Sequence, residues 1–493
     1  MISTTTLFAG CAPEVACGVD GRILAVGAPA REAAGRKAQV VRLKGIAWPG
    51  LIDSHIHLEG LAGAKLELDL TGAASLKETL DRVKSWAKNL PQGSWVVGSG
   101  WYNDAWPEPA FPTRALLDRA VGRRPAYLRR KDGHSAWVSS EALRVAGVDR
   151  GTEDPAGGGI DRDSDGEPTG ILRELAMQLV WDRVPRESDA DLDGAMARVL
   201  NDLAKFGLVA VHSMDSARGF ASLQRLRARG ELPVRVTYNI PVADLPHAER
   251  IGLRSGWGDS WLRVWGVKAF LDGSLGSRTA EMLDGSGTAR LSQADLEDVV
   301  TRCAKAELNV CLHAIGDGAV RRALDALAPH RNAWTQWRPR IEHAQCVHPK
   351  DMVRMARIGV IASMQPIHAV SDREIADAEW PNVVQGAYAW RALEKAGVKL
   401  AFGSDAPVET ADPIAGLTAA TTWRKRAKWH PELALTTSSA LRAYTANAAY
   451  AAGMEDDLGV LRRGKLCDMT VIDEGEVVAT VAGGRVTWRR KPA

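Results

Sequence analysis

The sequence predicts an α/β protein whose main domain is a (β/α)8 barrel. From about residue 200 onward, short apolar segments typical of strands alternate with longer segments typical of helices. A further apolar segment at residues 49–57 brings the number of expected strands to eight. Because strand–helix alternation is typical of a parallel sheet, eight such units predict a closed barrel of the TIM type.

Most of the expected strands end at a residue with a polar or metal-binding side chain. In chain order the strands end at or near His57, His212, Ile240, Lys268 and Phe270, His313, His343, Gln365 and Asp405. Helices are expected between most of them, at residues 295–306, 318–327, 350–358 and 390–396, and a last helical segment is expected at 437–450. All eight strand ends should therefore meet at one mouth of the barrel.

Both ends of the chain are rich in short strands, unlike the middle. Residues 1–48 and 455–493 alternate apolar and polar positions between glycine and proline turns. The simplest arrangement is one small β-sandwich built from both termini, flanking a barrel domain at residues 49–454. Roughly 145 residues separate the first two barrel strands, far more than a usual connection, so an inserted lobe is expected at about residues 66–200.

The composition argues against several classes of partner. The chain has 493 residues, 25% of them charged, and a net charge of +3, which gives no reason to expect nucleic acid or a membrane surface as a partner. Its six cysteines show no C-x-x-C spacing, and no signal peptide or membrane-spanning segment is recognisable. We therefore expect a cytoplasmic protein that acts on a small molecule, and a homo-oligomer is compatible with these data.

The clearest local motif is the pair His55 and His57 at the end of the first strand. In an extended strand, side chains two positions apart point to the same face, so both imidazoles lie side by side. Such a pair alone fits a satisfied surface pair as well as a metal site. A metal site would need further ligands at the ends of other strands.

Those further side chains are present. The strand ends carry four histidines, a lysine and an aspartate: His55, His57, Lys268, His313, His343 and Asp405. Packing alone rarely places six such residues at corresponding strand ends, so we interpret them as a metal site. The imidazole and carboxylate groups suit one or two Zn²⁺ or similar ions, which would activate a water as hydroxide. Asp405 would accept the proton of that water and pass it to a leaving nitrogen.

Lys268 needs a separate explanation, because divalent ions would repel a protonated lysine. The side chain is expected to be neutral, to be excluded from the site, or to be converted by CO2 to a carbamate. A carbamate is an anion and could bridge two metal ions.

The motifs resemble the amidohydrolase superfamily, in particular its family-3 branch, which includes N-substituted formamide deformylases. The resemblance covers nearly the whole chain, at residues 49–57, 98–101, 130–134, 168–170, 268–278, 313–317, 341–344, 364–368, 403–407 and 464–468. It implies that His55, His57 and Asp405 bind the more buried metal ion and that Asp405 shuttles the proton.

The same resemblance implies a second metal position. His313 and His343 would bind the second ion, and a carboxylated Lys268 would bridge the two. All of these ligand positions hold the residue that the family requires.

Four residues are candidates for contact with the substrate. His134 would reach over the site from the insertion, or else be a structural histidine in a turn. Arg278 would pair with a substrate carboxylate, or else cap the following helix. His368 would contact the substrate or polarise its carbonyl, and Trp101 would form part of an apolar wall.

The predicted function is metal-dependent hydrolysis of a C–N bond other than a peptide bond, by metal-activated hydroxide. The expected substrate is a small N-substituted amide, a formamide or an N-acyl compound. Dipeptidase, deaminase or esterase activity at the same site is an alternative, and a non-catalytic barrel scaffold is another. The complete set of ligands favours an enzyme.

Overall fold

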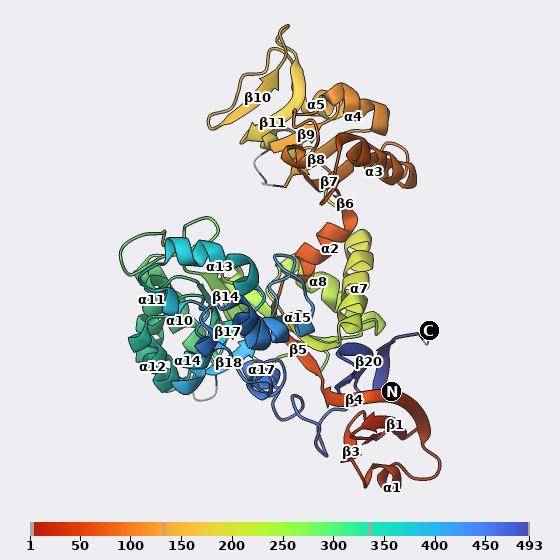
Figure 1. Ribbon diagram of the computed structural model, residues 1–493, viewed down its shortest axis with the longest axis vertical. Helices are drawn as coiled ribbons and strands as arrows, with labels where there is room; N and C mark the ends of the chain where they lie inside the picture. Colours follow the sequence, from red (N-terminus) through yellow and green to blue (C-terminus); the bar gives the residue numbers. More distant parts are fainter. Residues whose placement is uncertain (1–3, 132, 134, 334–336, 492–493) are drawn as a thin grey trace. The chain divides into compact units, whose positions relative to one another are not determined.

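The computed structural model of the protein describes residues 4–131, 133, 135–333 and 337–491. The chain divides into two compact units. The first comprises the chain up to Leu61 and from Met196 onward, and the second is Ala62–Ala195. The barrel and the terminal strands belong to the first unit, and the inserted lobe is the second (Figure 1). The domain limits at 48/49 and 454/455 stay predictions from the sequence.

Eight parallel strands form the barrel, as predicted. In sheet order they are β5 (Leu51–Ile56), β12 (Leu208–Ser213), β13 (Arg235–Pro241), β14 (Leu262–Phe270), β15 (Asn309–Ala314), β16 (Arg340–His343), β17 (Ile361–Met364) and β18 (Lys399–Phe402). Just beyond their ends, β18 and β5 are joined by backbone hydrogen bonds from Asp405 N to His55 O (2.7 Å) and from His57 N to Ala406 O (2.9 Å). These bonds bring the two edges of the sheet together and confirm the (β/α)8 architecture.

Helices cover the outside of the barrel (Figure 1). They include α7 (Asp189–Lys205), α8 (Ala217–Arg229), α9 (Leu245–Arg250), α10 (Gln293–Ala306), α11 (Asp317–Leu327), α12 (Pro349–Ile358), α13 (His368–Glu379), α14 (Trp390–Lys395), α15 (Pro413–Thr418) and α16 (Arg424–Ala427). The predicted helix at 437–450 is divided into α17 (Thr437–Ala443) and α18 (Ala446–Ala451). The break lies at Thr445, whose φ of −133° and ψ of −94° are not helical.

The two ends of the chain form one seven-stranded sheet. Its strands, in sheet order, are β21 (Arg485–Arg489), β20 (Glu476–Ala482), β19 (Met469–Asp473), β4 (Gln39–Pro49), β1 (Thr6–Ala12), β2 (Val15–Cys17) and β3 (Ile23–Val26). Ile23 and Val481, near opposite edges of this sheet, belong to one hydrophobic core together with Phe8 and Met469. The sheet therefore folds over on itself, with strands from both termini side by side (Figure 1).

The inserted lobe has its own sheet and its own core. The strands, in sheet order, are β10 (Gly158–Arg162), β11 (Pro168–Glu174), β9 (Ser135–Val138), β8 (Ala126–Arg130), β7 (Val96–Trp101) and β6 (Leu68–Asp69). The helices packed with them are α3 (Leu76–Asn89), α4 (Arg114–Val121), α5 (Ser140–Ala146) and α6 (Met177–Trp181), and the lobe is entered through α2 (Leu58–Leu66). Ser75 caps α3 by accepting a hydrogen bond from Glu78 N.

In the parts of the chain that the structure describes, none of the helices is long and apolar enough to cross a membrane.

A buried ion pair connects the barrel to the terminal sheet. Arg235 of β13 donates two hydrogen bonds to Asp468, the residue before β19, over 2.7 and 2.9 Å. Both side chains are almost completely buried. Gly483 N donates a third hydrogen bond to the same carboxylate. The pair therefore fixes the point at which the chain leaves the barrel domain and enters the sheet.

Asp468→Ala should destabilise the protein strongly, because it leaves the buried guanidinium of Arg235 without its carboxylate. Removing one partner of a buried pair costs about 3–5 kcal/mol of unfolding free energy. The measurement is the denaturant midpoint followed by circular dichroism. Asp473→Ala is the control, since its partner Lys44 is solvent-exposed and little stability should be lost. Equal midpoints for the two variants would contradict this role of Asp468.

Candidate metal centre

The six predicted ligand residues lie at the carboxyl ends of the barrel strands. His55 and Lys268 belong to β5 and β14, His313 and His343 belong to β15 and β16, and His57 and Asp405 follow β5 and β18. The ring centroids of His55 and His343 are 4.8 Å apart, and those of His313 and His343 are 4.4 Å apart. One potential ligand atom from each of His55, His343 and Asp405 lies within 4.8 Å of the other two.

Several of these groups point toward one another. Oδ1 of Asp405 is 3.1 Å from Nε2 of His57 and 3.4 Å from Nε2 of His55. Nζ of Lys268 is 3.5 Å from Nε2 of His55. The two imidazoles, the carboxylate and the amine therefore face a common space.

The outer nitrogens of three of the rings are held by hydrogen bonds. Nδ1 of His55 is 2.6 Å from Oε2 of Glu342, and Nδ1 of His343 is 2.8 Å from Oε1 of Gln365. Nε2 of His313 is 2.9 Å from the carbonyl oxygen of Gly273. Because all three partners are acceptors, each ring carries its proton on the outer nitrogen and presents a lone pair on the inner one.

The inner nitrogens fit a metal ion. Nδ1 of His313 is buried and has no hydrogen-bond partner among the described residues. A buried imidazole nitrogen without a partner is costly unless it is a ligand. Four imidazoles and a carboxylate are also the donor types that Zn²⁺ takes. The residues present therefore fit a divalent ion.

Burial also sets the protonation of the ligands. Burial and the charge of Lys268 lower the pKa of His55 to about 4 and that of His313 to about 3. Burial likewise lowers the pKa of Lys268. For Asp405, burial would raise the pKa, but the hydrogen bond from His57 and the nearby His55 hold it below its usual range. At neutral pH the rings of His55 and His313 are thus neutral and the carboxylate of Asp405 is ionised, as metal binding requires.

The backbone at two of the strand ends adopts an unusual conformation. His343 has a φ of 72° and Asp405 a φ of 58°, in the left-handed region that residues other than glycine rarely adopt. His343 is the last residue of β16, and Asp405 comes shortly after the end of β18, so both lie where the chain leaves a strand. Only glycine fits at the nearby position 403, because a Cβ there would lie 2.4 Å from His55 N. Strain of this kind is typical of functional sites.

Residues 39–488 match the model of the amidohydrolase family. The chain belongs to this family. It is 33% identical to the protein LONG AFTER FAR-RED 3 of Arabidopsis thaliana, over 94% of this chain and 87% of the relative. It is 29% identical to the N-substituted formamide deformylase of Arthrobacter pascens, over 93% of this chain and 89% of the relative.

A solved structure agrees with this assignment. An uncharacterized metal-dependent hydrolase from Pyrococcus furiosus superposes with a TM-score of 0.77 at 29% identity, over 96% of this chain and 98% of the other. This amidohydrolase is therefore a metal-dependent hydrolase of C–N bonds, which confirms the enzyme class predicted from the sequence.

Two groups of the amidohydrolase centre were missed by reasoning from the sequence. Glu342 and Arg340 are fully buried, with Nε of Arg340 2.8 Å from Oε1 of Glu342 and Nη2 of Arg340 3.0 Å from Oε2. Burial would raise the pKa of Glu342, but Arg340 and His55 hold it well below its usual range. The signal was present, since Glu342 lies in the segment 341–344 that carries the family resemblance.

The candidate substrate contacts have different outcomes. His368, the first residue of α13, is buried, and its Nε2 lies 3.8 Å from Oδ2 of Asp405. Arg278 is exposed and forms an ion pair of 2.9 Å with Glu379 at the end of α13. His134 lies outside the described residues.

Trp101 does not form a substrate-facing wall, and that prediction is wrong. The side chain is completely buried in the core of the inserted lobe, and its Nε1 donates a hydrogen bond of 2.8 Å to Leu128 O. Trp106 and Trp137 lie with their ring centroids 6.1 Å from that of Trp101. Trp101 is thus one member of an aromatic cluster inside the lobe.

An aromatic ring on the barrel lies closer to the ligands. Phe270 is two positions after Lys268 on β14, so both side chains share one face of the strand. The Phe270 ring centroid is 5.1 Å from that of His313, and Nζ of Lys268 lies 4.7 Å from the Phe270 ring centroid. The side chain is nevertheless 40% exposed, unlike the buried ligands. It therefore offers an accessible apolar surface next to the centre.

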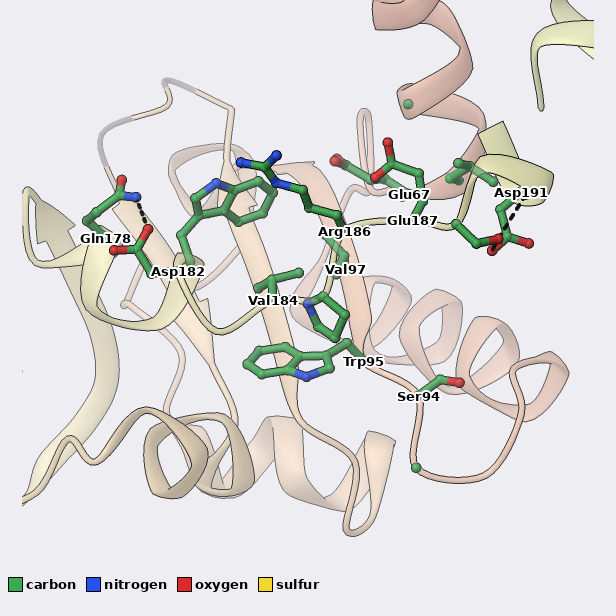
Figure 2. A pocket seen from close by; sticks show the side chains of 16 residues that line it. Glu67, Ser94, Trp95, Val97, Gln178, Asp182, Val184, Arg186, Glu187 and Asp191 are labelled. Atoms are coloured by element: carbon green, nitrogen blue, oxygen red, sulfur yellow. Dashed lines mark hydrogen bonds between the residues drawn. The ribbon is translucent and has the colours of Figure 1, made fainter. Parts of the chain in front are cut away.

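The inserted lobe contains a separate cavity of about 730 Å³ (Figure 2). Trp95, Val97 and Val184 give it apolar walls, and Glu67 and Arg186 are among its charged residues. None of the six ligand residues lines this cavity. The cavity is therefore not part of the metal centre.

Proposed function

We propose that this amidohydrolase binds one or two divalent ions, with Zn²⁺ best suited to the ligands. Its proposed reaction is hydrolysis of the C–N bond of a small N-substituted amide, formamide or N-acyl compound. The observation that supports this proposal most is the arrangement of the rings at the barrel mouth. Their outer nitrogens are hydrogen-bonded, and their inner lone pairs face the space shared with Asp405 and Lys268.

The proposed ligands divide into two groups. His55, His57 and Asp405 would hold one ion, and His313 and His343 would hold a second. When bound, the metal supplies a water acidified to a pKa of about 7 and polarises the carbonyl group of the substrate.

Asp405 is the proposed proton carrier. Its Oδ1 faces the two histidines after β5, whereas its Oδ2 faces His368. Because the carboxylate is ionised at neutral pH, Oδ2 can accept the proton of the attacking water and deliver it to the leaving nitrogen. Nε2 of His368 has no hydrogen-bond partner among the described residues, and in this proposal it binds the carbonyl oxygen of the substrate.

We also propose that Lys268 is carboxylated. Burial lowers the pKa of its amine and so favours the neutral form, which is the form that adds to CO2. The addition forms an N–C bond and releases one proton, which gives a carbamate anion. The change replaces a group that a cation would repel with one that can bridge two ions.

The substrate class is supported by the surroundings of the ligands. Phe270 offers an exposed aromatic face beside His313, which suits an apolar substituent on the substrate. The relative from Arthrobacter pascens is named an N-substituted formamide deformylase, and a formamide of this class carries a substituent on its nitrogen. Cytoplasmic location and assembly into a homo-oligomer stay predictions from the composition.

A substrate screen of the Zn²⁺-loaded protein tests the reaction. N-substituted formamides or N-acyl compounds should be hydrolysed. Asp405→Asn should lower kcat by a factor of about 10²–10⁴, because the amide cannot carry the proton. The readouts are steady-state kinetics and bound zinc per chain.

Other outcomes of the screen would contradict the proposal. Turnover of dipeptides, esters or amino-substituted rings alone would favour the dipeptidase, esterase or deaminase alternative. No bound metal after expression in metal-supplemented medium would favour the scaffold. Unchanged kcat in Asp405→Asn would remove the proton-carrier role.

Carboxylation of Lys268 can be observed directly. After equilibration with ¹³C-bicarbonate, the carbon NMR spectrum should contain one carbamate signal. Lys268→Met should lose that signal. Lys465→Met is the matched control, since Lys465 is also a buried lysine but bonds to Glu455 O away from the ligands. A wild-type spectrum without a carbamate signal would exclude the modification.

Phe270→Ala should change the selectivity of the enzyme. Loss of the ring should lower kcat/KM about tenfold or more for substrates with an aromatic substituent. This agrees with the free energy of ~1.5–3 kcal/mol that is gained when a large apolar group is buried. A substrate with a methyl substituent should be affected much less. Trp257→Ala is the control, because this exposed tryptophan precedes β14 at the opposite end of the barrel. An equal loss for both substrates would argue against contact with the substituent.

A further inference from the structure

We infer that the two metal positions have unequal affinity, so that the position of His55, His57 and Asp405 fills first and the position of His313 and His343 fills later and more weakly. This inference rests on the ligands proposed above. The observation behind it is the chemical nature of the group that holds each ring from behind.

The first position is supported by a carboxylate. Glu342 accepts a hydrogen bond of 2.6 Å from His55, and neither side chain is exposed. Arg340 contacts both oxygens of Glu342 and also donates to Ser363 Oγ (2.9 Å) and Ser54 O. The guanidinium thus keeps the carboxylate ionised and fixes its direction toward His55.

At the second position, the hydrogen-bond acceptors behind the rings are neutral groups. His343 bonds to the amide oxygen of Gln365, and His313 bonds to the backbone carbonyl of Gly273. The carboxylate of Asp272 lies 3.5 Å from Nε2 of His313. It already accepts hydrogen bonds from the backbone N–H groups of Glu281, Ile315 and Gly316.

The difference should change metal affinity. A carboxylate behind a histidine increases the electron density on the coordinating nitrogen and orients the ring, and losing such a partner typically weakens metal binding by about 10–100-fold. The first position also has the negative charge of Asp405 in contact with its rings. The second position has no carboxylate ligand of its own in the described chain, and it shares Lys268 with the first. At limiting metal the centre should therefore hold one ion.

A metal titration tests this inference without reference to activity. Metal-free full-length protein is titrated with Zn²⁺ in competition with a chromophoric chelator, in buffer containing bicarbonate. The wild-type protein should bind two ions in two steps, the first at least about tenfold tighter than the second. His57→Ala should weaken the tighter step, and His313→Ala should remove the weaker one.

Exchange of the supporting groups gives the sharper test. Glu342→Gln should lower the zinc affinity of the first step by about 10–100-fold. Gln365→Glu should raise the zinc affinity of the second step and so reduce the difference in affinity between the two steps. Gln345→Glu is the matched control. Gln345 is also buried, but its Nε2 lies 3.3 Å from Nδ1 of His368, which is not a proposed ligand. Both binding steps should be unchanged in this control.

The outcomes separate the inference from the proposed function. Two equal steps in the wild type would overturn the inference, and so would a first step that Glu342→Gln leaves unchanged in a folded protein. If Glu342→Gln fails to fold, the titrations of the wild-type protein and of Gln365→Glu still show whether the two positions differ in affinity. An absence of zinc binding in the wild type would instead overturn the metal centre itself.

Discussion

The structure of the centre depends on the buried ion pair between Arg340 and Glu342. The pair lies inside the barrel, where a single unpaired charge would be very costly. Its hydrogen bonds reach Ser54 and His55 on β5, His212 on β12 and Ser363 on β17. One pair of charges thus ties the strand that begins the barrel to strands from its later part. It also fixes the ring of His55, so the stability of the barrel and the geometry of the ligands have a common origin.

Much of the fold and of the centre could be predicted from the sequence, because parallel strands impose simple rules. Their carboxyl ends meet at one mouth, so residues such as His313 and Asp405 had to lie near each other once the strands were recognised. The family resemblance then assigned their roles. No comparable rule predicts which way a side chain in the inserted lobe points. The predicted role of Trp101 was wrong for this reason. The division of the predicted helix at 437–450 was also missed, because nothing in its composition marks Thr445 as a break.

The role of Glu342 escaped prediction for a geometric reason. In a regular strand neighbouring residues point to opposite faces, so Glu342 and His343 are not expected at the same site. The positive φ of His343 breaks this alternation and turns its ring toward the other histidines. Asp405 leaves its strand in the same way. Local backbone strain thus allows short strands to supply both the ligands and the groups behind them.

The terminal sheet has a consequence for synthesis of the chain on the ribosome. Strand β4 pairs on one side with β1 and on the other with β19, and Leu51 N bonds to Thr470 Oγ1, 419 positions away. During translation the edge of β4 must therefore stay without its partner until almost the whole barrel has emerged. An unpaired strand edge is a site for wrong pairing and aggregation. Strand β4 is thus made long before its pairing is completed, and its open edge is exposed to wrong pairing during that time.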